Sequence, residues 1–321
     1  MIEQIGRAAV FVLLPICCST GLMAQNGAGS TPRVTHVLGF ENIPNNATGD
    51  LSLQAHALRF QKNEATGAQI SVDSIQGLFL GVEDKQVGGT AMAISRAATP
   101  YGGGRVIGLF SHKKYDTLTA EYVDTNGGFH GAIFQLTKGQ GQALKDQLVA
   151  EGAHVTNLQN APQAALPLTL VASPQPLAQT WSVQVDKVDP GDVDIEPAFR
   201  VAIYENLLDE LAKTKQFKQV FRSGDRAANG SNLLILKTTV QKYTPGSETR
   251  RAVTTVSGAT KLNVRSQLCT RDGKVVVEQV VNGNVRFFGG NLRATHNLAR
   301  NVAEAIKKSD LPEATLSSVE R

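Results

Sequence analysis

The 321-residue sequence predicts an α+β protein with two domains, and three observations carry that prediction. Residues 33–152 hold many β-type segments separated by turn residues and end in one short helical pattern. Residues 153–180 contain four prolines and cannot continue a helix, which predicts an extended linker. Residues 181–311 alternate strand-like and helix-like periods. With 41% hydrophobic and 19% charged residues, the chain has the composition of a globular protein.

Residues 1–24 predict a secretory signal peptide. Arg7 precedes an apolar run from Ala8 to Ile16, and small residues follow up to Ala24. A basic head, a short apolar core and a small-residue end are typical of such signals. The apolar run is shorter than the roughly 20 residues that span a bilayer. We therefore expect cleavage after Ala24 and an exported protein of the periplasm, the outer-membrane periphery or the medium.

Three cysteines limit the redox chemistry of the chain. Cys17 and Cys18 lie within the expected signal, so lipid attachment there is an alternative to cleavage after Ala24. The preceding Pro15-Ile16 fits poorly with the small residues of a lipoprotein signal. Cys269 alone remains in the mature chain, so we expect no internal disulfide.

The first domain, residues 33–152, is predicted to consist mainly of strands. Leu51–Phe60 alternates apolar and polar residues in part, and Gln69–Glu83 is a long β-rich run. Asp84–Gly104 is rich in Gly and Ala, which predicts a loop, and Val106–Phe110 returns as a strand.

A hairpin and a helix close this domain in the sequence. Leu118, Ala120 and Tyr122 share one strand face, residues 124–128 form the turn, and residues 129–136 return. Thr137 with Gln140 matches a capping box at the start of a helix. Leu144 and Leu148 then lie on one face of that helix.

The second domain, residues 181–311, is predicted as β-α-β-β-β-α, with helices on one side of an antiparallel sheet. Its first strand is Trp181–Val188, and Pro197 suits the first turn of a helix that reaches about Lys215. Apolar residues recur every four positions along that helix: Phe199, Ile203, Leu207 and Leu211. Three further strands and a closing helix follow, at Leu233–Tyr243, Ala259–Leu268, Lys274–Val285 and from Gly289-Gly290-Asn291, where Ala294, Leu298, Val302 and Ile306 share a face. Asp272-Gly273 predicts the hairpin turn between the last two strands.

Both domains resemble known folds. The hairpin and capped helix of Lys114–Leu148 resemble the end of a pleckstrin-homology-like barrel of the bacterial type. The second domain resembles the small α+β domains of secreted and outer-membrane lipoproteins, including the curli-secretion type, on Phe199–Lys215, Thr244–Ser247 and the closing helix. The first resemblance implies an interaction module, and the second implies a subunit of an outer-membrane export or assembly complex as one alternative function.

Motifs for catalysis or cofactor binding are sparse, so we expect a protein that is not an enzyme and holds no metal or cofactor. No two of the six histidines have the spacing of a zinc site. Gly102-Gly103-Gly104-Arg105 lacks the Lys-Ser/Thr of a P-loop. A secreted hydrolase remains an alternative, with Ser95, His112 and Asp116 as its candidate residues, although no nucleophile-elbow motif surrounds Ser95.

The two predicted domains differ in their balance of basic and acidic residues. Residues 33–152 hold 10 Lys/Arg and 11 Asp/Glu, whereas residues 233–309 hold 13 Lys/Arg and only 4 Asp/Glu. A basic face of this kind binds anionic lipid, polymer or protein surfaces, or is simply solvated. Candidate contacts are Arg250, Arg251, Arg265, Arg286, Arg293, Lys307 and Lys308, with a minor basic patch at His112, Lys113 and Lys114.

These observations favour a non-enzymatic, exported envelope protein that binds a partner or an anionic envelope surface. Nucleic acid is not an expected partner, because the chain is predicted to be exported and lacks a run of stacking aromatics beyond Phe287-Phe288. No later segment has the 18 consecutive apolar residues of a transmembrane helix, so no membrane span is expected.

Overall fold

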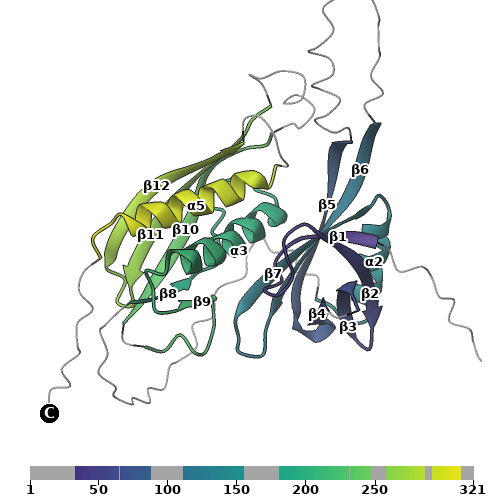
Figure 1. Cartoon of the computed structure of the whole chain (residues 1–321), viewed down its shortest axis with the longest axis horizontal. Coiled ribbons are helices and arrows are strands. Elements are labelled where there is room, and N and C mark those ends of the chain that lie inside the picture. Colours follow the sequence, from purple (N-terminus) through teal and green to yellow (C-terminus); the bar gives the residue numbers. More distant parts are fainter. Residues whose placement is uncertain are drawn as a thin grey trace, which may run out of the picture. The chain divides into compact units, whose positions relative to one another are not determined.

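The computed structural model describes residues 33–64, 66–87, 111–154, 181–230, 232–246, 258–285 and 291–311. The predicted signal peptide, the strand predicted at Val106–Phe110 and nearly all of the predicted linker lie outside these ranges. The described residues belong to one compact unit, Pro32–Arg321. They form two sheets and three α-helices, which confirms the α+β class (Figure 1).

Sheet A has seven strands in the order β4-β3-β2-β1-β7-β6-β5, and all its neighbours are antiparallel. One 3₁₀ turn, η1, precedes β5, and one helix, α2, follows β7. The bounds are β1 Arg33–Leu38, β2 Ala47–Gln54, β3 Ala57–Asn63, β4 Thr66–Ser71, η1 Val72–Ser74, β5 Ile75–Val87, β6 Ser111–Val123, β7 Phe129–Thr137 and α2 Gln140–Ala150. The described residues show no pairing between the end strands β4 and β5, so the sheet is not closed.

Sheet B has five strands in the order β12-β11-β10-β8-β9. Helices α3 and α5 lie side by side over one of its faces (Figure 1). The bounds are β8 Ser182–Val185, α3 Pro197–Thr214, β9 Val220–Phe221, β10 Leu233–Thr244, β11 Thr260–Thr270, β12 Val275–Val285 and α5 Arg293–Lys307. Ile203 and Leu207 of α3 and Leu298 of α5 belong to the apolar helix faces predicted from the sequence. All three are fully buried, in one core with the inner residues of this sheet.

The structure corrects three predictions about the strands. Leu51–Phe60 is not continuous, because Ala55 and His56 adopt φ values of 49° and 58° and turn the chain between β2 and β3. Strand β5 continues through residues 84–87, where a loop was predicted, because their backbone pairs with the start of β6. Sheet B is mixed rather than antiparallel, since the crossover through α3 returns the chain parallel to β8, which pairs with both β9 and β10.

The predicted capping box of α2 is also wrong. The N-cap position is Gly139, with φ of 89°, and it has no local side-chain cap. Instead, Oδ2 of Asp116 in β6 accepts the backbone N–H of Gly139 at 2.7 Å and that of Gly141 at 2.9 Å. A carboxylate from the neighbouring strand therefore satisfies the helix N-terminus. Leu144 and Leu148 are buried against sheet A, as their spacing predicted.

Candidate functional site

The structure distributes the predicted basic residues over several surfaces. Arg293, Lys307 and Lys308 are exposed on α5 or at its C-terminal end. Arg265 lies in β11 on the opposite face of sheet B, because its inward-facing neighbours Val264 and Ser266 are buried. Arg250, Arg251 and Arg286 lie outside the described residues. The structure therefore brings together the three residues of α5 and separates Arg265 from them.

The two groups also differ in how their charges are compensated. Arg265 forms a bidentate ion pair with Glu278, with Nε–Oε1 and Nη2–Oε2 distances of 2.9 and 3.0 Å. Within the described ranges, Arg293, Lys307 and Lys308 form no ion pair. The net positive charge of α5 is therefore available to an anionic partner, whereas that of Arg265 is largely neutralised.

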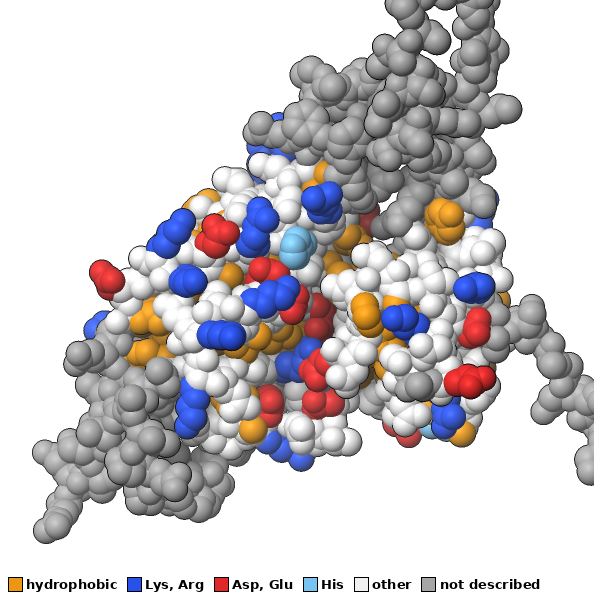
Figure 2. All heavy atoms as spheres, in the orientation of Figure 1, with side chains coloured by type: hydrophobic (Ala, Val, Ile, Leu, Met, Phe, Trp, Pro, Cys, Tyr) orange, Lys and Arg blue, Asp and Glu red, His pale blue; other side chains and the backbone are white. Residues whose placement is uncertain are grey.

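A further basic residue of α5, Arg300, was not among the predicted contacts. Arg293, Arg300 and Lys307 recur every seven residues, so they lie along one face of the helix over roughly 20 Å. Arg300 and Glu304 are 3.9 Å apart and both are half exposed, and such a pair contributes little. The spacing of seven was present in the sequence and could have identified this row. Figure 2 shows Lys and Arg side chains spread over the face where Figure 1 places α3 and α5.

The minor basic patch is only partly described. His112 and Lys113 pair through their backbones with Gln86 and Lys85 in β5, and their side chains lie outside the described set. Lys114 follows them in β6 and is exposed.

The alternative hydrolase residues do not form a described constellation. The carboxylate of Asp116 is buried and engaged by the two amides of α2, and Ser95 lies outside the described residues. Asp116 therefore has a structural role that its sequence neighbourhood did not reveal.

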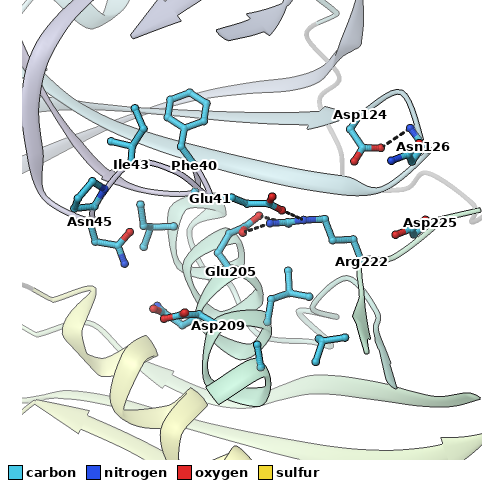
Figure 3. A pocket seen from close by; sticks show the side chains of 17 residues that line it. Phe40, Glu41, Ile43, Asn45, Asp124, Asn126, Glu205, Asp209, Arg222 and Asp225 are labelled. Carbon is cyan, nitrogen blue, oxygen red and sulfur yellow. Dashed lines mark hydrogen bonds and ion pairs between the residues drawn. The ribbon is translucent and has the colours of Figure 1, made fainter. Parts of the chain in front are cut away.

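A cavity of about 620 Å³ has an acidic lining (Figure 3). It lies among the loop after β1, the β6–β7 turn, α3 and the segment after β9. Five carboxylates and one guanidinium line it: Glu41, Asp124, Glu205, Asp209, Asp225 and Arg222. This charge repels anions, so the anionic partner expected from the sequence does not fit here.

A buried ion pair at this cavity joins the two sheets. Glu205 of α3 accepts two hydrogen bonds from Arg222, at Nη1–Oε1 2.9 Å and Nη2–Oε2 3.1 Å (Figure 3). Its Oε1 also accepts the backbone N–H of Gly131 in β7 at 2.9 Å. Arg222 in turn donates to the carbonyl of Phe129 at 3.2 Å and to Glu41 at 3.2 Å. We call Glu205, Arg222 and Gly131 the clamp.

Burial and the opposite charge of the partner act in opposite directions on each group of the clamp. Burial raises the pKa of Glu205, although Arg222 and the Gly131 amide oppose that shift. The pKa of Arg222 is raised by the Glu205 carboxylate, even though burial acts against it. Because both charges lose their hydration on burial, the net stabilisation from such a pair is small compared with the cost of removing one partner.

Two more contacts extend the connection between the sheets. The Tyr204 hydroxyl donates to the carbonyl of Phe129 at 3.1 Å and accepts the N–H of Ser223 at 2.9 Å. At Gly131, a Cβ would lie 2.4 Å from Cγ1 of Val201, so only glycine allows α3 to approach β7 this closely. The arrangement holds α3 against both sheets.

Within the described ranges, no group of three or more His, Cys, Asp or Glu side chains is arranged to hold a metal ion. No helix in the described part of the chain has the length and apolar character needed to cross a membrane.

No protein-family model matches this chain, and no curated protein matches it. Among solved structures it is similar to a single-substitution variant of the PelC dodecamer from Paraburkholderia phytofirmans, with 15% identity and a TM-score of 0.32, covering 42% of this chain and 95% of that one. The PelC dodecamer from the same organism aligns with 15% identity and a TM-score of 0.31, covering 41% and 92%. Likeness at this level carries no argument about function, which has to be inferred from the residues themselves.

Proposed function

We propose that this chain is an exported, non-enzymatic binding protein that attaches to an anionic surface of the cell envelope through α5. The observation that carries the proposal is the row of exposed cations Arg293, Arg300, Lys307 and Lys308, of which only Arg300 has an acidic partner within the described ranges. Each basic residue near an anionic membrane contributes about 1 kcal/mol to attachment. Four such residues on one helix are enough for reversible, salt-sensitive binding.

The proposal gives the two halves of the chain different roles. We assign residues 33–152 to a pleckstrin-homology-like interaction module, and the strand order of sheet A followed by α2 supports this. We assign residues 181–311 to an α+β module of the lipoprotein type, which presents the basic helix. The signal peptide predicted at residues 1–24 favours export.

The test compares two variants that each remove three positive charges. The helix-face variant is Arg300→Gln/Lys307→Gln/Lys308→Gln. The sheet-face variant is Lys237→Gln/Lys242→Gln/Lys261→Gln, on exposed positions of β10 and β11 that point away from the helices. Binding to phosphatidylcholine vesicles, with and without phosphatidylglycerol, is measured by cosedimentation over a range of salt concentrations.

We expect the wild type to bind only the anionic vesicles and to lose that binding as salt is raised. The helix-face variant is expected to bind about 100-fold more weakly, which corresponds to about 1 kcal/mol for each lost charge. The sheet-face variant is expected to lose less than about tenfold, from the long-range field alone. Equal losses in both variants would contradict an α5-specific surface, and binding by neither protein would contradict the anionic surface itself.

A further inference from the structure

The side chain of His36 in β1 is fully buried in an aromatic cluster. Its ring stacks on that of Phe40 in the loop between β1 and β2, with 4.9 Å between the ring centroids. The rings of Phe60 in β3 and Phe134 in β7 lie beside it at 5.6 and 5.9 Å. Among the described residues, no Asp, Glu, Lys or Arg side chain acts on the His36 ring. The imidazole is therefore buried without a charged partner, which favours its neutral form.

A hydrogen bond from the loop determines where this ring carries its proton. The backbone N–H of Phe40 donates to Nε2 of His36 at 3.2 Å. Because Nε2 accepts, the neutral ring carries its proton on Nδ1. Nδ1 has no hydrogen-bond partner of good geometry within the described residues, although the carbonyls of Leu38 and Pro44 are near enough to favour the charged form. A second proton can therefore add only at Nε2.

Protonation of Nε2 is incompatible with the position of the loop. The nitrogen would change from an acceptor to a donor, and its N–H would face that of Phe40 across 3.2 Å. The charged ring would also be shielded from water, since His36 is 0% exposed. Burial accordingly lowers the pKa of His36 to about 4 from the ordinary 6.5. The ring takes up a proton more readily once the loop has left it.

The same loop borders the acidic cavity. Six of its residues line that cavity: Gly39, Phe40, Glu41, Ile43, Pro44 and Asn45. Glu41 reaches from the loop toward Arg222 of the clamp, and its carboxylate accepts from Nε of Arg222 at 3.2 Å (Figure 3). At the far end of the loop, the N–H of Asn46 donates to the carbonyl of Val37 at 3.1 Å. Release of the Phe40 end would therefore open one side of the cavity.

We propose that residues 39–46 form an acid-released lid over the acidic cavity, with His36 as its latch. When Nε2 of His36 takes a proton from solvent, the N–H of Phe40 loses its acceptor. The loop then moves away from β1 and withdraws Glu41 from Arg222, and loss of the proton restores the closed state. This inference goes beyond attachment through α5 and involves none of the residues of that helix, so the two proposals can fail separately.

The test is amide hydrogen exchange of the mature chain, followed by NMR at pH 7 and pH 5 and expressed as protection factors. The amides of Phe40 and Asn46 report opening of the lid, and the amides within the β6–β7 pair report global unfolding. A pKa of about 4 in the closed state and an ordinary 6.5 in the open state make opening about 20-fold more frequent at pH 5. We expect the protection of both lid amides to fall by that factor. Low concentrations of urea should accelerate exchange in β6–β7 but not in the lid, because local opening exposes little surface.

Two histidine variants separate the latch from other titrating groups. His36→Gln offers an amide oxygen to the N–H of Phe40 and does not titrate, so the protection of the lid amides should be the same at both pH values. His56→Gln removes a half-exposed histidine that pairs with Asp73 and Glu151, and it should keep the wild-type response.

The ring nitrogens of His36 provide a readout that needs no substitution. At pH 7, nitrogen NMR of the wild type should show a protonated Nδ1 and an unprotonated Nε2. The proposal is overturned if the protection of Phe40 and Asn46 does not fall with pH, if it falls equally in His36→Gln, or if urea accelerates exchange in the lid as much as in β6–β7. It is also overturned if His36 is protonated at pH 5 while the Phe40 amide stays protected.

Discussion

Replacing Glu205 by alanine tests whether the clamp holds the two sheets together. The side chains of Glu205 and Arg222 are only 8% and 12% exposed, and the substitution removes three hydrogen bonds at once. It leaves the Arg222 guanidinium buried without its main partner and the Gly131 amide without an acceptor. Breaking a buried ion pair from one side costs about 3–5 kcal/mol. We expect Glu205→Ala to lower the free energy of unfolding by that amount.

Two control variants separate the possible causes of that loss. Glu205→Gln keeps an oxygen that accepts the Gly131 N–H and one bond from Arg222, so it should cost about 1–3 kcal/mol. The double variant Glu205→Leu/Arg222→Met removes both charges, and it should be more stable than Glu205→Ala alone because no buried charge remains unpaired.

The assay is urea unfolding followed by the fluorescence of Trp181, the only tryptophan in the chain, and by circular dichroism. Hydrogen exchange at the Gly131 amide reports the clamp directly, because that N–H donates to Glu205. A Glu205→Ala protein within about 1 kcal/mol of the wild type, with Gly131 still protected, would refute the reasoning.

Three further predictions concern single positions. Gly131→Ala should destabilise by about 1–3 kcal/mol, because its Cβ would lie 2.4 Å from Cγ1 of Val201, and adding Val201→Ala should restore part of the loss in urea unfolding. Asp116→Ala should cost about 1–2 kcal/mol by uncapping α2, while Asp116→Asn, which keeps an acceptor, should cost less; equal midpoints for both would contradict the cap. Burial lowers the pKa of His36 to about 4 from the ordinary 6.5, so the unfolded chain binds the extra proton and stability is lost as pH falls from 6.5 towards 4. Urea midpoints should show a loss of about 2 kcal/mol between pH 7 and pH 5 that His36→Gln removes, and a parallel loss in that variant would assign it to other groups.

The periodic elements of the fold could be predicted from the sequence. The four-residue spacing from Phe199 to Leu211 identified α3, and Asp272-Gly273 identified the turn between β11 and β12, where Gly273 has φ of 87°. The hairpin turn at Ala55-His56 could not be predicted, because it needs positive φ at two successive residues and Ala rarely adopts that conformation. Its His56 instead pairs with Asp73 and Glu151, which are distant in the sequence.

The clamp could not be predicted from the sequence, because its residues are far apart in the chain. Glu205 and Gly131 are 74 positions apart, and nothing local marks them as partners. One signal was present: Ala198, Val201 and Ala202 lie off the apolar stripe that faces sheet B, and they pack against Leu38 and Ile133 of sheet A. A helix with apolar residues on two sides indicates that it contacts two layers.

Fractionation of the producing cell tests attachment through α5 most directly. The membrane pellet is washed first with salt and then with detergent, for the wild type and for the helix-face variant. We predict that salt alone releases the wild type, and that the helix-face variant is recovered in the soluble fraction without a wash. Release of the wild type by detergent only, or the same distribution for both proteins, would contradict the account.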